Sequence, residues 1–150
     1  MRTTLLRTII IVSCLGFLSQ SAFCQELNMT DYEWKNRLVL VIAEDHKNEK
    51  YLQQIKELTD HKPGLYERKL LIIEVQKDKY KVRDDKNEWM LSKRPYRQYS
   101  NPSSAFQVVL IGLDGGIKER RSDTISAEEL FQKIDAMPMR LSELRSKKKN

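Results

Sequence analysis

The residues best suited to chemistry form a short polar run from Glu44 to Glu49, directly after the apolar segment Arg37 to Ala43. Glu44, Asp45 and His46 could bind a cation together, or His46 could act as a base. Contiguous side chains in an exposed connection rarely converge on one point, however. Nor does the sequence contain a nucleophile–base pair, a phosphate-binding glycine loop or the spacing of zinc ligands. We therefore predict no catalytic residue, no metal site and no cofactor.

The two cysteines, Cys14 and Cys24, lie in an N-terminal segment with the features of a secretory signal peptide. Two arginines precede an apolar stretch of about ten residues, and small residues stand three and one before Gln25. We predict a signal peptide over residues 1–24, with cleavage between Cys24 and Gln25, and a periplasmic or extracellular protein. An uncleaved anchor and a lipidated Cys24 are the alternatives.

Removal of this leader leaves a mature chain without a thiol, which excludes dithiol exchange. It also leaves 25 basic residues (27 minus 2) against 21 acidic ones. Residues 76–105 hold eight basic and four acidic residues, and residues 140–150 hold five and one. An anionic partner would meet these two segments first, unless both are simply solvated. We expect no membrane span in the mature chain.

The segment 76–105 is the best candidate for binding, because its aromatic residues alternate with cations. Trp89, Arg94, Tyr96 and Arg97 are the residues that we select from it. Aromatic and guanidinium groups together suit an acidic protein surface or an anionic polymer. The export signal makes nucleic acid an unexpected partner. In the competing interpretation the aromatic side chains pack this segment onto the rest of the domain.

The order of the secondary-structure signals predicts the fold that would position these residues. Two apolar runs of strand length, Arg37 to Ala43 and Lys69 to Val75, flank a helical pattern that begins after Asn48 and ends at Pro63-Gly64. This order makes a βαβ unit with parallel strands. The long segment 76–105 follows as an insertion, with a short helix expected over Lys86 to Leu91.

A hairpin and a final helix complete the pattern. Asp114-Gly115-Gly116 supplies a tight turn after the apolar run that starts at Phe106, and the returning strand is charged enough for an edge. Ser126 to Glu129 forms a capping box, and Pro138 ends the helix that follows. We therefore predict an α/β, thioredoxin-like domain over residues 25–144, with a four-stranded mixed sheet flanked by helices. A basic, disordered tail is expected over residues 145–150.

Three stretches of the chain resemble a known family: YEWKNRLVLVIA (32–43), LIGLDGGIK (110–118) and IDAMPMR (134–140). They are similar to the domain of unknown function 4174, also called the DUDES or peroxiredoxin-like domain. Such domains occur alone in bacterial exported proteins and within sushi-repeat proteins of the animal extracellular matrix. The residues that carry the resemblance are Asp114, Gly115, Gly116, Asp135, Met137, Pro138, Met139 and Arg140.

This resemblance implies a thioredoxin-like fold and an exported location, and it provides no catalytic residue. Leu113 departs from the family, which usually has a lysine there. Our functional hypothesis is a non-enzymatic module that binds a protein or an anionic polymer. The alternatives are an enzyme or redox-accessory protein that uses residues 44–49, and a structural protein without a small ligand.

Overall fold

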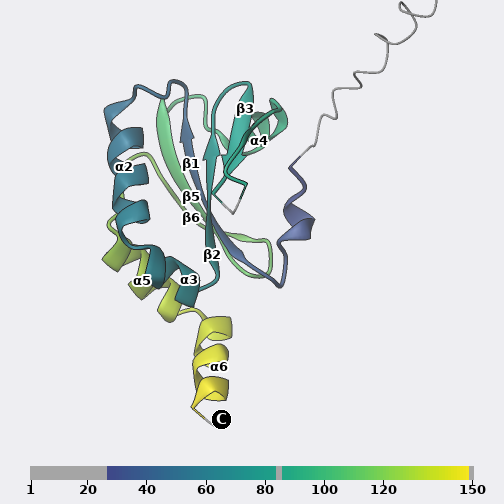
Figure 1. Cartoon of the computed structure of the whole chain (residues 1–150), viewed down its shortest axis with the longest axis vertical. Coiled ribbons are helices and arrows are strands. Elements are labelled where there is room, and N and C mark those ends of the chain that lie inside the picture. The colour runs from purple at the N-terminus through teal and green to yellow at the C-terminus, as the bar shows by residue number, and fades with distance from the viewer. Residues whose placement is uncertain (1–26, 84–85, 149–150) are drawn as a thin grey trace, which may run out of the picture.

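The computed structural model of the 150-residue chain describes residues 27–83 and 86–148, which form a six-stranded sheet with helices on both faces (Figure 1). The strand order is β4-β3-β2-β1-β5-β6. The predicted signal peptide and its cleavage site lie outside the described residues. In the described part of the chain, no helix is long and apolar enough to cross a membrane.

The βαβ unit is present as predicted. β1 (Arg37–Ala43) and β2 (Leu70–Val75) pair in parallel along their length. α2 (Glu49–Asp60) connects them and begins at Asn48, whose side-chain oxygen accepts a hydrogen bond from the backbone N–H of Tyr51. The Pro63-Gly64 pair does not lead directly into the strand, because it lies inside a second short helix, α3 (Lys62–Glu67).

The insertion corrects the predicted number of strands from four to six. β3 (Lys79–Val82) pairs antiparallel with β2, and β4 (Trp89–Leu91) pairs antiparallel with β3. The alternating segment Lys79-Tyr80-Lys81-Val82 has the two-residue period of a strand with one apolar face. The short helix of this segment is α4 (Arg94–Tyr99), and the helix expected over Lys86 to Leu91 was wrong, since β4 occupies that stretch.

The hairpin of β5 (Phe106–Ile111) and β6 (Ile117–Arg121) is also present as predicted, with β6 at the edge of the sheet. Gly115 adopts a φ of 74°, which L-residues rarely take. A Cβ atom at this glycine would lie 2.7 Å from a carboxylate oxygen of Glu33. The backbone conformation therefore favours glycine in this turn, whereas the flexible end of the Glu33 side chain could move away from an added Cβ atom.

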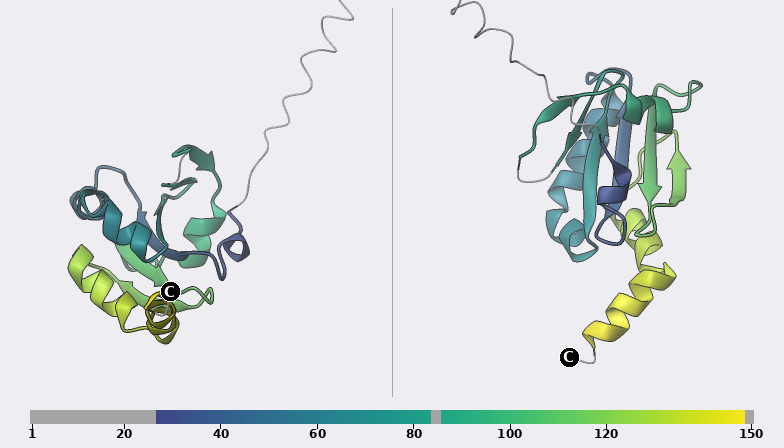
Figure 2. Two further views of the ribbon diagram at one scale, coloured as in Figure 1. Left: turned by 60° about the horizontal axis from the view of Figure 1, so that its bottom comes forward. Right: turned by 90° about the vertical axis from the view of Figure 1, so that its right-hand side faces the viewer.

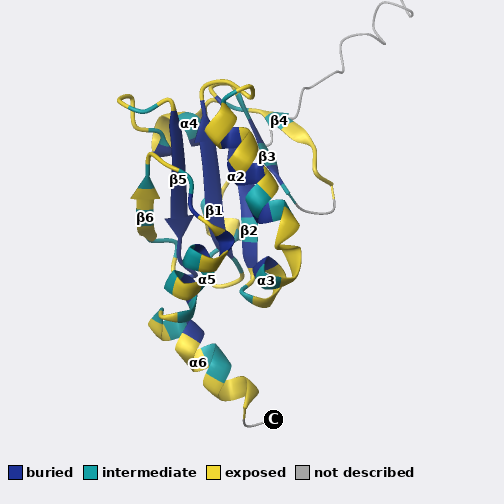
Figure 3. Cartoon of the chain, turned by 90° about the vertical axis from the view of Figure 1, so that its left-hand side faces the viewer, coloured by how far each residue is buried: buried dark blue, intermediate teal, exposed yellow. Residues whose placement is uncertain are grey.

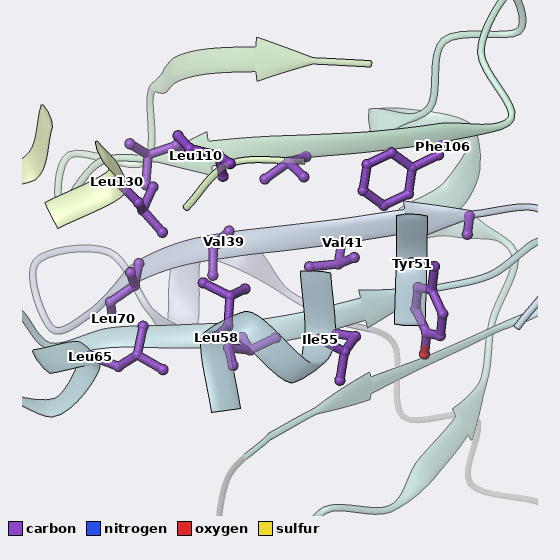
Figure 4. Packing of buried hydrophobic residues seen from close by; sticks show 14 of the residues in the cluster. Val39, Val41, Tyr51, Ile55, Leu58, Leu65, Leu70, Phe106, Leu110 and Leu130 are labelled. Atoms are coloured by element: carbon purple, nitrogen blue, oxygen red, sulfur yellow. The ribbon is translucent and has the colours of Figure 1, made fainter. Parts of the chain in front are cut away.

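Each face of the sheet has its own hydrophobic core. On one face, side chains of β1, β2 and β5 pack against α2, α3 and α5 (Ala127–Asp135), with Tyr51, Leu58 and Leu130 among them (Figure 4). On the other face, side chains of β1, β2, β3 and β5 pack with Tyr99 of α4 and with the segment around η1 (Met29–Asp31). Figure 3 shows the resulting contrast between buried central strands and exposed outer helix surfaces.

The C-terminal part consists of two helices separated by Pro138. The Ser126 hydroxyl accepts a hydrogen bond from the backbone N–H of Glu129 and caps α5, as predicted. α5 ends at Asp135, but Pro138 then stands in the first turn of α6 (Pro138–Lys147). α6 projects from the body of the domain (Figure 2) and takes in the first residues of the predicted tail.

Candidate functional site

The connection between β1 and α2, where the sequence suggested chemistry, contains side chains that contact close neighbours. Glu44 accepts a hydrogen bond from the Tyr96 hydroxyl at 3.3 Å and pairs with the Lys77 ammonium, also at 3.3 Å. Asp45 pairs with His46 at 3.2 Å. No group of three His, Cys, Asp or Glu residues within 27–83 and 86–148 could hold a metal ion. These side chains therefore do not converge on a common point.

A buried carboxylate on β2 organises a second polar cluster. Glu74 is 2% exposed and contacts the Lys81 ammonium at 2.9 Å and the Arg83 Nε at 2.5 Å, both from β3 or its end. Its other oxygen accepts a hydrogen bond from the Tyr51 hydroxyl of α2. Burial, and then this hydrogen bond to Glu74, raise the pKa of Tyr51 well above its usual value of 10. One carboxylate thus holds two cations in place.

Lys81 connects this cluster to Trp89 on the neighbouring strand. The Nζ atoms of Lys79 and Lys81 lie 5.0 and 4.8 Å from the centre of the Trp89 ring, within the range of cation–π contacts. Trp89 stands opposite Lys81 in the sheet, and Leu91 stands opposite Lys79. We call the surface formed by Lys79, Lys81, Arg83, Trp89 and Leu91 the ribbon face. Trp89 and Leu91 remain 39% and 73% exposed there.

The ribbon face contributes no residue to the hydrophobic cores described above, although Lys81 and Arg83 are largely covered, with side chains 13% and 27% exposed. The hydrophobic core on this side of the sheet contains residues of β1, β2 and β5 and of three helices, and none of β3 or β4. The opposite side of the same strands is covered, because Tyr80 and Met90 belong to the core around α4. β3 and β4 therefore present one face that packs into a core and one cationic face on which Trp89 and Leu91 are exposed.

The four residues selected from the sequence do not form one patch. Trp89 lies on the ribbon face, whereas Arg94, Tyr96 and Arg97 belong to α4, which packs with the core on the other side of the sheet. Tyr96 is partly buried and packs against this core, as the competing interpretation had proposed for the aromatic residues. β4 ends at Leu91, and α4 begins at Arg94 and packs on the opposite side of the sheet. The exposed side chains of β4 and of α4 therefore face opposite directions.

A cavity of about 940 Å³ adjoins the ribbon face at Arg83. It lies between α3, the first half of β2 and the end of β3, and Thr59, Tyr66 and Leu71 are among its lining residues. Four cationic residues are among its lining residues: Lys62, Lys69, Arg83 and Lys147. Sequence reasoning missed Lys79 of the ribbon face and the cavity. The alternation of Lys79, Lys81 and Arg83 with apolar residues was the signal that indicated a cationic strand face.

The family motif at residues 134–140 serves a different purpose from the ribbon face. Arg140 is 1% exposed and donates hydrogen bonds to Asp135 at 3.1 Å and to Glu67 at 2.6 Å. Arg68 also donates to Asp135. Asp135 thus joins α5 to α3 and α6. Met137 packs against the core, and Met139 is half-buried.

The same cluster reaches the start of the first strand. Arg37 is fully buried and pairs with Glu143 of α6 at 3.0 Å, and Glu143 also accepts a hydrogen bond from Arg140 at 3.4 Å. Burial opposes ionisation of Asp135 and Glu143, but hydrogen bonds from the arginines outweigh it and lower the pKa of both carboxyls. The cluster therefore fixes the first turn of α6 on the body of the domain.

Comparison with known proteins agrees with this architecture. Residues 28–143 match the family described as Domain of unknown function (DUF4174). Among curated proteins, none matches the chain. A solved structure of Plasmodium vivax 2-Cys peroxiredoxin in its reduced form resembles it with a TM-score of 0.55 and 15% identity, over 77% of this chain and 72% of that one. At this identity the likeness shows the thioredoxin-like fold alone.

Proposed function

The chain belongs to the DUF4174 family, and on that premise we propose that it is an exported, thiol-free module that binds an anionic partner and catalyses no reaction. The observation that carries this proposal is the ribbon face. The Nζ atoms of Lys79 and Lys81 lie 5.0 and 4.8 Å from the ring centre of Trp89, which is 39% exposed, and the cavity with its cations lies next to this face. Aromatic and cationic groups on an uncovered surface favour a ligand with negative charge.

The arrangement around Glu74 supports binding because it leaves an excess of positive charge in a fixed position. Lys81 and Arg83 share one buried carboxylate, so their charges are only half balanced by it. Arg83 uses its Nε for this contact, and a guanidinium carries further N–H donors. A cation that is already ordered loses less side-chain entropy when a ligand arrives. The cations of the ribbon face are thus already ordered before an anion binds.

Export rests on the leader sequence and remains part of the proposal. Cys14 and Cys24 are the only cysteines of the chain, and both precede Gln25. Sequencing the N-terminus of the mature protein tests this point, and we expect Gln25 as the first residue. A mature protein that retains Cys24, whether acylated or free, would overturn the thiol-free assignment.

The alternative of an enzyme that uses residues 44–49 has less support. Asp45 accepts a hydrogen bond from the backbone N–H of Lys47 at 3.0 Å, which is the local geometry of a capped turn. Glu44 and His46 contact neighbouring side chains. A phenotype for Asp45→Asn or His46→Ala with an intact fold would revive this alternative.

Site-directed crosslinking tests the proposed binding directly. A photoreactive phenylalanine replaces Leu91 on the ribbon face, and the matched control replaces Arg97, which is exposed on α4 on the other side of the sheet. We expect partners to be captured in the native compartment from position 91, and to be lost in ~0.5 M salt because salt screens exposed charges. Equal capture from both positions, or none from position 91, would contradict the proposal.

A further inference from the structure

Exposed apolar side chains gather around the ribbon face. Of the seven large apolar residues that are exposed in the described chain, four lie on β4, α2 and α3 on this side: Leu52, Tyr66, Trp89 and Leu91. Leu52 stands seven residues before Thr59, on the same side of α2, and Thr59 lines the cavity together with Tyr66. Apolar and cationic residues are therefore interspersed on this side of the sheet.

The cavity is also lined by both apolar and cationic residues. Its apolar lining includes Pro63, Leu70 and Leu71, and its cations are the four named above. Glu67 is the acidic residue among the described lining residues, and its carboxylate is already engaged by Arg140 at 2.6 Å and by Arg68 at 3.4 Å. The charge available to a ligand in the cavity is therefore positive.

The spacing of the cations matches an extended polypeptide. Lys79, Lys81 and Arg83 alternate along one strand and its end, so their Cα atoms lie about 7 Å apart. Side chains on one side of an extended peptide repeat at the same distance. Acidic residues at alternate positions of such a peptide can face these cations where they reach the surface (the Lys81 and Arg83 side chains are 13% and 27% exposed), while the remaining side chains meet Leu52, Tyr66 or Trp89.

We propose that the ribbon face and the adjoining cavity bind an extended peptide segment in which acidic and apolar residues are mixed. This inference rests on the proposed function and narrows it to one class of ligand. An acidic polysaccharide would gain from the cations and from Trp89, but it has no aliphatic groups to bury against Leu52 or Leu91. A membrane surface would meet the exposed ribbon face and leave the concave cavity unused.

Fluorescence anisotropy with defined probes tests the inference on the full mature chain. The first probe is a labelled peptide of three Glu-Leu-Glu-Ser repeats, and the second, of three Glu-Ser-Glu-Ser repeats, has the same charge without the leucines. A hexameric oligogalacturonate and phosphatidylglycerol vesicles represent the other two ligand classes. We expect the leucine-containing peptide to bind about tenfold more tightly than the other probes, because burial of leucine adds to the electrostatic attraction.

Two variants and one control locate the binding. Tyr66 is 88% exposed, so Tyr66→Ala should fold normally and weaken the leucine-containing peptide about threefold to tenfold while leaving the serine peptide unchanged. Lys62→Glu should weaken both peptides. Arg97→Glu carries the same charge reversal on α4 and should change neither.

The outcomes separate this inference from the proposed function. Equal binding of both peptides, or preference for the oligogalacturonate or the vesicles, would overturn the peptide inference and leave an anion-binding module. Binding of no anionic probe would overturn both. Unchanged affinity in Tyr66→Ala and Lys62→Glu would also overturn the inference, because the peptide would then bind away from the cavity.

Discussion

The two clusters of buried charge in this domain differ in their balance. Around Arg140, three arginines (Arg37, Arg68 and Arg140) meet three carboxylates (Glu67, Asp135 and Glu143). Around Glu74, two cations share one carboxylate, and one of them also contacts an exposed tryptophan. The balanced cluster joins α6 to the body of the domain, whereas the unbalanced one borders an open surface. Buried ion pairs of similar geometry thus serve assembly in one place and leave charge for a partner in the other.

Removal of the central arginine is the strongest test of this contrast. Arg140→Ala leaves three carboxylates without one of their cations, and loss of one partner of a buried pair costs about 3–5 kcal/mol. We expect the free energy of unfolding in urea to fall by about that amount. Arg145→Ala, at an exposed position of the same helix, is the control and should show no measurable change. A fall of less than about 1 kcal/mol for Arg140→Ala would show that α6 is held mainly by apolar contacts.

Neutralisation of the shared carboxylate should weaken both folding and binding. Glu74→Gln removes charge-assisted hydrogen bonds worth about 1.5–3 kcal/mol each in typical proteins, and Lys81 and Arg83 lose their fixed positions. Titration of tyrosine absorbance should also show the pKa of Tyr51 moving back toward 10, since a neutral amide disfavours phenolate less. Retained affinity for the leucine-containing peptide would contradict the role given to Glu74.

Acid should weaken the ion pairs of the cluster around Arg140. The folded-state pKa values of Asp135 and Glu143 lie below the usual values of 3.8 and 4.5. These two carboxylates therefore stabilise the fold fully at a pH above the usual values, and this stabilisation is lost as the pH falls through their folded-state pKa values. We expect the melting temperature to decrease below about pH 4, and to decrease less in Asp135→Asn. Equal acid sensitivity of the variant and the parent would assign acid unfolding to other carboxyls.

The smallest effect on stability is expected on the ribbon face. Lys79→Ala removes one cation–π contact, worth about 0.5–1 kcal/mol at exposed sites. Binding of the anionic probes should weaken severalfold all the same, because a ligand would meet this charge directly. Denaturant unfolding and anisotropy on the same preparation check both parts. A stability loss as large as that of Glu74→Gln would mean that Lys79 supports the fold rather than a partner.

The central strands and the strands of the insertion differ in how well the sequence predicted them. The bounds of β1, β5 and β6, the caps at Asn48 and Ser126 and the parallel βαβ unit followed from local signals. The two strands of the insertion did not. β4 has three residues, and its pairing with β3 depends on a partner brought beside it by the fold. A run that short carries no periodicity of its own.

The order of the main elements, the fold class and the absence of thiols after residue 24 follow from the amino-acid sequence, because apolar periodicity, caps, turn residues and cysteine positions are local properties of the chain. Which charges are neutralised depends instead on the tertiary structure. Arg37 and Glu143 stand 106 residues apart in the chain, and Trp89 and Arg97 lie near each other in sequence but on opposite sides of the sheet. Charge balance depends on distances in space, which the pairing of strands and the docking of helices set.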